Sequence, residues 1–188
     1  MKHRIIDYNA PTTLSFVLLS AAALLLGALS AGRSTTLLFS VYRAPLSDLL
    51  SYPRFFLHVL GHASFTHFAG NIPLLLVLGP SLEERYGSRS IALAIVLTAF
   101  VSGLLQWLLF PGTALLGASG IVFMMLLMAS LGGSRGRGVP LTLILVFIIY
   151  IGGEIVKGVS ITDNISQLAH VIGGVSGTVL GIALRRNR

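Results

Sequence analysis

Ser119 lies in the run Gly117-Ala118-Ser119-Gly120, where small residues leave the backbone around its hydroxyl open. An apolar stretch of helical length begins at this point. The first amides of a helix lack partners within the helix, so they can hold an oxyanion formed when a serine attacks a carbonyl. The run therefore suits a nucleophile. Small residues also allow close packing of membrane helices, and the four residues taken alone favour this structural interpretation over a catalytic one.

His170 is the candidate base for this serine. Gly173, Gly177 and Gly181 follow it on one face of a predicted helix. Such glycines let a helix press against a neighbouring backbone, which would direct the imidazole into the same interface. A lone buried histidine is as often structural, but beside an open-backbone serine it indicates a Ser–His pair.

His67 and Asn71 are spaced i, i+4 and share one face of a second helix. Both side chains donate hydrogen bonds of the kind that stabilises an oxyanion. A polar clasp between two helices is the alternative, and the two residues alone do not separate these possibilities.

His58 and His62 have the same spacing, which is compatible with zinc binding. The chain has no cysteine, no carboxylate completes the set, and His67 would be a third ligand only from another face. We therefore expect no metal and no cofactor, with structural hydrogen bonds for His58 and His62. The absence of cysteine also excludes disulfides and a thiol nucleophile.

The composition is that of a membrane protein. Of the 188 residues, 54% are hydrophobic and only 10% are charged, and the mean hydropathy is +0.88. A soluble domain carries about 25% charged residues, so this chain has too few to cover a water-facing surface. One compact membrane domain over residues 13–184 fits the length, between a polar N-terminal segment at 1–12 and a basic tail at 185–188.

Six apolar runs have the length of a membrane span. We expect spans at 13–31, 65–82, 91–110, 116–131, 140–156 and 165–184. The first run also has features of a cleaved signal peptide, although it is longer than the usual apolar core. Residues 32–62 mix apolar side chains with Arg33, Arg43, Asp48 and Arg54, so we expect them to lie in the membrane interface without crossing it.

The charge distribution predicts the orientation. Six spans put both termini on one side, together with nine of the thirteen Lys and Arg residues. This bias predicts cytoplasmic termini, and the small size suggests a bacterial inner membrane. The net charge of +7 arises from residues beside apolar runs, so lipid headgroups explain it better than nucleic acid does. Glu83 and Arg85 are expected to form a structural turn with paired charges.

Five segments together resemble the rhomboid family of intramembrane serine proteases, over about residues 10–184. The matching segments are Arg54 with His58 and His62, the H-x-x-x-N at His67–Asn71, the E-x-R-x-G-S at Glu83–Ser88, the G-x-S-G at Gly117–Gly120, and the A-H-x-x-G-x-x-x-G at Ala169–Gly177. Each motif is weak alone, but five in the right order are specific.

The resemblance implies an all-α bundle of six transmembrane helices with a membrane-embedded first external loop. It implies a Ser119–His170 dyad, an oxyanion site made by His67, Asn71 and the backbone of Ala118 and Ser119, and cleavage of transmembrane protein substrates within the bilayer. Supporting positions are Gly117, Gly120, Phe123, Gly173 and Gly177. Phe123 departs from the tyrosine that many bacterial members carry, so its ring remains without the hydroxyl.

Two alternatives remain open. A non-catalytic rhomboid-like protein would bind transmembrane helices without cutting them, although such relatives usually lack the serine or the histidine. A small transporter or channel would place acidic residues in mid-span, whereas all six acidic residues here lie in loops or at the ends of spans.

Overall fold

The computed structural model describes residues 9–132, 141, 144–145, 148 and 164–185, with residues 164–170 described by their backbone. Its long helices are α1 (Pro11–Leu29), α4 (Phe65–Tyr86), α5 (Ser88–Leu109), α6 (Ser119–Gly132) and α8 (Asn164–Arg185). Shorter helices are α2 (Arg33–Leu37), α3 (Ser51–Leu57) and the 3-10 turn η1 (His58–Leu60). No strand occurs in these residues, so the predicted helical class is confirmed for them.

Three described helices, α1, α4 and α5, are long and apolar enough to cross a bilayer. A helix of 22 residues spans about 33 Å, which matches the hydrocarbon thickness. The expected spans at 13–31, 65–82 and 91–110 fall on these helices, and those at 116–131 and 165–184 fall on α6 and α8. The expected span at 140–156 lies almost wholly outside the described residues.

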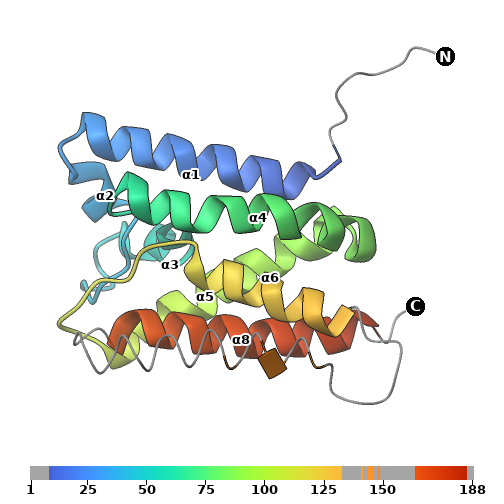
Figure 1. Cartoon of the computed structure of the whole chain (residues 1–188). Coiled ribbons are helices and arrows are strands. Elements are labelled where there is room, and N and C mark those ends of the chain that lie inside the picture. The colour runs from blue at the N-terminus through green and yellow to red at the C-terminus, as the bar shows by residue number, and fades with distance from the viewer. Residues whose placement is uncertain (1–8, 133–140, 142–143, 146–147, 149–163, 186–188) are drawn as a thin grey trace, which may run out of the picture.

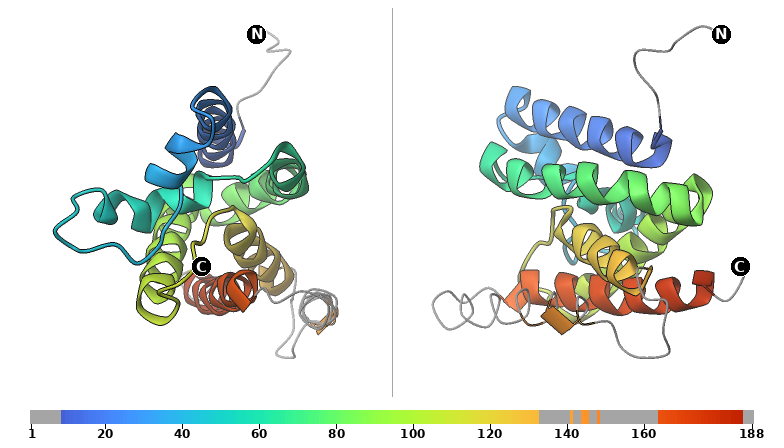
Figure 2. Two further views of the ribbon diagram at one scale, coloured as in Figure 1. Left: turned by 90° about the vertical axis from the view of Figure 1, so that its left-hand side faces the viewer. Right: turned by 45° about the vertical axis from the view of Figure 1, so that its right-hand side comes forward.

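The short helix α6 occupies the middle of the bundle (Figures 1 and 2). It packs against α4, α5 and α8, and its side chains at Ile121, Val122, Phe123, Met124 and Met125 are all buried. A helix that is apolar on every side requires such a central place. The start of α6, where Ser119 lies, is therefore held by the surrounding elements.

Glycine makes the contact between α6 and α8 possible. A methyl group on Gly173 would collide with the carbonyl oxygen of Gly120, and one on Gly177 would collide with the backbone of Met124. Both contacts are four residues apart on each helix, so α6 and α8 run parallel in a constant register. Backbones can approach this closely only where no side chain intervenes.

Residues 33–60 form a scaffold at the end of the bundle where α6 begins (Figure 1). Buried Arg54 organises it: Nε donates to the carbonyl of Leu37 at 2.8 Å, Nη1 donates to the Asp48 carboxylate at 2.8 Å, and the guanidinium lies over the Tyr42 ring. Hydrogen bonds from the Leu50 amide and from Arg54 lower the pKa of Asp48. The scaffold is thus held together by a buried arginine whose charge is paired with Asp48.

Glu83 at the other end of α4 caps α1. Its buried carboxylate accepts hydrogen bonds from the Thr12 amide at 3.1 Å, the Thr13 amide at 2.6 Å and the Thr13 hydroxyl at 2.7 Å. The first amides of a helix need such acceptors. The expected pairing of Glu83 with Arg85 is wrong within the described residues, because Arg85 instead lies over the Tyr86 ring.

Candidate active site

Ser119 is the first residue of α6, and the turn before it leaves backbone donors free. The carbonyl of Ala118 accepts the first helical hydrogen bond, from Val122 at 2.9 Å. Within the described part of the chain, the amides of Ala118 and Ser119 make no hydrogen bond. Two donors at a helix N-terminus beside a half-buried serine form the arrangement that an oxyanion requires.

The scaffold of residues 33–60 fixes the loop that leads into α6. Val41 and Leu115 exchange two backbone hydrogen bonds of 2.9 Å, and the amide of Gly117 donates to the carbonyl of His58 at 2.9 Å. Gly117 has φ of +124°, a conformation that side chains rarely allow. The glycine of the sequence motif is therefore needed for the backbone turn that presents Ser119.

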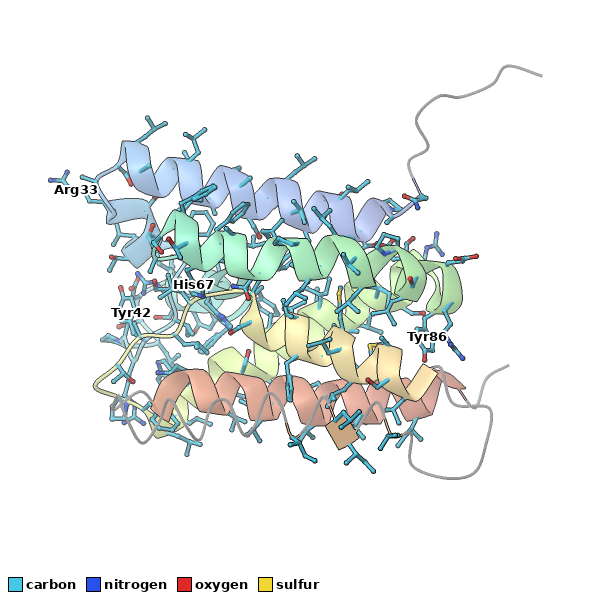
Figure 3. All side chains as sticks on the ribbon, in the orientation of Figure 1. Arg33, Tyr42, His67 and Tyr86 are labelled. Atoms are coloured by element: carbon cyan, nitrogen blue, oxygen red, sulfur yellow. The ribbon has the colours of Figure 1, made fainter. Side chains whose placement is uncertain are left out.

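His67 is brought to this turn by the start of α4. Ser64 is the N-cap of α4 and its hydroxyl accepts the His67 amide at 3.1 Å, which fixes His67 in the first turn. The imidazole faces Gly117, since a methyl group there would lie 2.8 Å from both Nε2 and Cε1. Figure 3 shows His67 near the start of α6, with Tyr86 at the far end of α4.

His62 connects His67 to Asn71. Its Nδ1 donates to the carbonyl of Leu60 at 3.1 Å, so the neutral ring accepts at Nε2 from the Asn71 amide at 3.4 Å. The His62 and His67 rings meet edge to face at 5.1 Å. Burial, reinforced by the neighbouring His67, lowers the pKa of His62 to about 4. His62 is therefore neutral near pH 7 and keeps its acceptor lone pair.

Asn71 is buried, and both of its amide hydrogens have partners. Besides His62, the amide donates to the carbonyl of His67 at 3.1 Å, one turn back along α4. The contact with His62 is the longer of the two and hence the weaker. One donor of Asn71 can thus be redirected to another acceptor at modest cost.

The register of α6 and α8 locates position 170. Gly173 lies against Gly120, and His170 precedes Gly173 by about one turn of α8. Since the two helices run parallel, position 170 lies at the end of the pair where Ser119 begins α6. One turn further along α8, Gly174 lies against the fully buried ring of Phe123.

His58 occupies a separate polar pocket against α5. Its Nε2 lies 3.1 Å from the carbonyl of Ala99 and 3.4 Å from the hydroxyl of Ser102, and its Nδ1 has no partner in the described residues. Burial lowers its pKa to about 3. His58 and His62 thus face different helices, and the described residues contain no cluster of three His, Asp or Glu side chains that could hold a metal.

A cavity of about 930 Å³ opens beside these residues, between α1, α2, the start of α4 and the loop before α6. His62, Ser64 and Leu116 line one side of it, and α1 from Ala21 to Ala28 lines the other. It is large enough for several side chains of an extended peptide and reaches the turn that presents Ser119.

The structure therefore brings Gly117, Ala118, Ser119 and His67 together, and joins Asn71 to this group through His62. In the sequence, His62 is a candidate metal ligand, a structural residue and part of one segment that resembles the family, but it is not placed in the oxyanion site. The available signal was that His62 lies five residues before His67 and nine before Asn71. At these separations the three side chains come together only when a turn precedes the helix.

Sequence comparison relates the chain to known proteins. The family model described as the Rhomboid domain matches residues 50–187. The rhomboid protease GlpG of Serratia proteamaculans is 31% identical over 148 residues, covering 76% of this chain and 51% of that protein. Rhomboid-related protein 1 of Caenorhabditis elegans is 28% identical over 144 residues, covering 71% and 40%.

A third relative, the chloroplastic rhomboid-like protein 11 of Arabidopsis thaliana, is 26% identical over 121 residues, covering 64% of this chain and 40% of that protein. The chain thus spans about half the length, or less, of the curated relatives it matches. The family match covers most of the chain and includes the part of the scaffold from residue 50 onward together with α4, α5, α6 and α8. With its long apolar helices, the chain therefore belongs to the rhomboid family of integral membrane proteins.

Proposed function

We propose that the chain is an intramembrane serine endopeptidase that uses a Ser119–His170 dyad. The observation that carries the proposal is the start of α6. There the amides of Ala118 and Ser119 have no partner among the described residues, the His67 ring lies against Gly117, and position 170 lies at the same end of the α6–α8 pair. A relative named as a protease supports the same activity. The other two relatives are named only as rhomboid-related and rhomboid-like, so the activity requires a direct test.

In the proposed mechanism, His170 takes the proton from Ser119 as the hydroxyl oxygen attacks a peptide carbonyl of the substrate. The resulting oxyanion accepts hydrogen bonds from the Ala118 and Ser119 amides. The intermediate collapses to an acyl-enzyme, and His170 delivers its proton to the departing amine. Water, deprotonated by His170, then attacks the ester, and Ser119 is restored when it recovers the proton.

His67 and Asn71 supply the side-chain donors in this proposal. His67 already faces Gly117, so its ring nitrogen needs little movement to reach an oxygen bound at the start of α6. Asn71 would exchange its 3.4 Å contact with His62 for a hydrogen bond to the oxyanion. His62 is a positioning residue in this proposal, since it holds the Asn71 amide and contacts the His67 ring.

A fluorophosphonate probe tests the dyad. It reacts with serines whose hydroxyl is activated by a base, so detergent-solubilised wild type should be labelled, whereas Ser119→Ala and His170→Ala should not. Ser130→Ala is a matched control, because this buried serine on the same helix donates to its own backbone at Leu126. Labelling of His170→Ala at the wild-type rate would refute the dyad.

The competing proposal is a rhomboid-like protein that binds transmembrane helices without cleaving them. A folded wild type that resists the probe but still retains a transmembrane peptide would favour it. Cleavage of such a peptide by wild type, with binding retained and cleavage lost in Ser119→Ala, would exclude it.

We also propose a six-helix core in a bacterial inner membrane, with both termini in the cytoplasm. The excess of Lys and Arg on the terminus side supports this orientation. A reporter that is active only outside the cytoplasm should be silent when fused after residue 188. It should be active when fused after residue 112, in the turn between α5 and α6; the opposite pattern would reverse the orientation.

A further inference from the structure

A second groove lies between α1 and α5, at the opposite end of the bundle from Ser119. Its volume is about 450 Å³. Phe16 and Ile95 form its buried floor, and Leu19 and Val96 form exposed walls. From Thr12 to Leu19 the helix rises about 10 Å, so the groove is elongated along both helices.

The groove changes character along its length. Thr12, Ser88 and Arg89 gather where α1 and α5 begin. Over the next two turns of each helix the lining is apolar apart from Ser15. Arg89 is exposed and makes no ion pair within the described residues. The positive charge of Arg89 therefore lies at the mouth of an apolar groove.

This gradient identifies the class of occupant. The two helices that form the groove have the length and hydropathy of membrane spans, so we expect the groove to open toward lipid. A phospholipid has the complementary shape, with an anionic group at one end and an acyl chain behind it. We propose that the groove between α1 and α5 binds one phospholipid with an anionic headgroup, with its phosphate at Arg89 and an acyl chain over Phe16 and Ile95.

Among the described residues, the acidic group that is hydrogen-bonded to the groove lining does not oppose this binding. Glu83 accepts the amide of Thr12, which lines the groove, but its carboxylate is buried and accepts three hydrogen bonds from Thr12 and Thr13. The neighbouring Thr12 hydroxyl donates to the carbonyl of Ser88 at 2.9 Å and holds the two helix starts together. Arg89 thus lines the mouth of the groove, and among the described residues it makes no ion pair with this carboxylate, which already accepts three hydrogen bonds.

Native mass spectrometry of the full chain from a neutral detergent tests the proposal. The probes are phosphatidylglycerol and phosphatidylcholine with identical acyl chains. Wild type should retain one phosphatidylglycerol in preference to phosphatidylcholine. Arg89→Gln should weaken phosphatidylglycerol binding about fivefold, as expected for one basic residue at a lipid surface, and remove the preference. Arg89→Lys should retain most of it.

Arg85→Gln is the matched control, because it removes the same charge at the same end of the bundle from an exposed arginine outside the groove. It should leave binding unchanged. Ala92→Phe, which fills the groove without altering charge, should weaken the binding of both lipids. Glycerol 3-phosphate should not compete, because it carries the phosphate but lacks the acyl chain that a lipid site requires. A site for a free anion would bind it without the chain.

Three results would overturn the proposal. Equal losses in Arg85→Gln and Arg89→Gln would indicate unspecific attraction to basic residues. Unchanged binding in Arg89→Gln and Ala92→Phe would place the lipid elsewhere. Competition by glycerol 3-phosphate would indicate a site for a free phosphate. None of these outcomes depends on whether the chain cleaves peptides, so the lipid site and the proposed protease activity stand or fall separately.

Discussion

The imidazole of His67 lies directly against Gly117, two residues before Ser119, and no side chain at position 117 would fit between them. The contact joins the first turn of α4 to the turn that opens α6. Glycine is required at position 117 for two reasons. Its φ of +124° is rarely adopted by other residues, and the His67 ring occupies the space that a side chain would need.

Gly117→Ala should therefore impair the site more than the fold. The methyl group would push the His67 ring away or shift the turn, and a displacement of about 1 Å at a catalytic group lowers rates about 10²-fold. Strain at the positive φ should cost about 1–2 kcal/mol of unfolding free energy. Probe labelling rates and thermal unfolding measure the two effects.

Gly112→Ala is the control for this change, because open space surrounds Gly112 in the same loop. It should leave labelling and stability close to the wild type. Equal behaviour of the two variants would mean that the contact with His67 is immaterial to the site.

Asn71→Ala should slow peptide cleavage about 10²–10³-fold, mainly through kcat, if Asn71 donates to the oxyanion. The lost hydrogen bonds to His67 and His62 should cost only about 1 kcal/mol of stability each. Steady-state kinetics on a transmembrane peptide, with unfolding measured in parallel, separate the two effects. Cleavage within twofold of the wild type would exclude Asn71 from the oxyanion site.

Gly173→Ala should destabilise the packing of α8 on α6, because the new methyl group meets the carbonyl of Gly120. Overpacking of this kind costs about 1–3 kcal/mol. The matched control is Gly70→Ala in α4, where a methyl group meets nothing and alanine favours the helix by up to about 1 kcal/mol. Denaturant unfolding in detergent should thus move in opposite directions for the two variants; a shift in the same direction would contradict the close contact.

Glu83→Gln should loosen the start of α1. The neutral amide accepts more weakly than the carboxylate that now binds two amides and one hydroxyl, so a loss of about 1–3 kcal/mol is expected. Glu84→Gln, at an exposed neighbouring position, should change stability little. Hydrogen exchange at the first turn of α1 should rise in Glu83→Gln alone, and equal exchange in both variants would argue against the cap.

Stability should fall as the pH drops below about 6.5. Burial lowers the pKa of His58 to about 3, so the unfolded chain takes up a proton that the folded chain refuses. Between pH 7 and pH 5 this costs about 2 kcal/mol for His58. His62, whose pKa is lowered to about 4, adds in the same direction.

Thermal unfolding across this pH range measures the effect. His58→Gln keeps a donor for the Ala99 carbonyl but cannot titrate, so its stability should depend less on pH than that of the wild type. If the stability of His58→Gln depends on pH as steeply as that of the wild type, the pH dependence arises from groups other than His58.

The sequence by itself determined the helical class, the membrane character and the residue types that carry the chemistry. These follow from local properties: apolar runs of span length, the spacing of His67 and Asn71 along one helix, and the small residues around Ser119. The rhomboid family was identified correctly from five motifs in order, and the family match confirms it. The roles of Ser119, His170, His67 and Asn71 remain predictions.

Only the tertiary structure decided which groups meet. Asp48 pairs with Arg54, Glu83 caps α1 through Thr12 and Thr13, and His62 lies between His67 and Asn71. Helical periodicity shows which residues share a face, but not the rotation and register of one helix against another. Those are set by close packing between residues such as Gly120 and Gly173, which lie far apart in the chain.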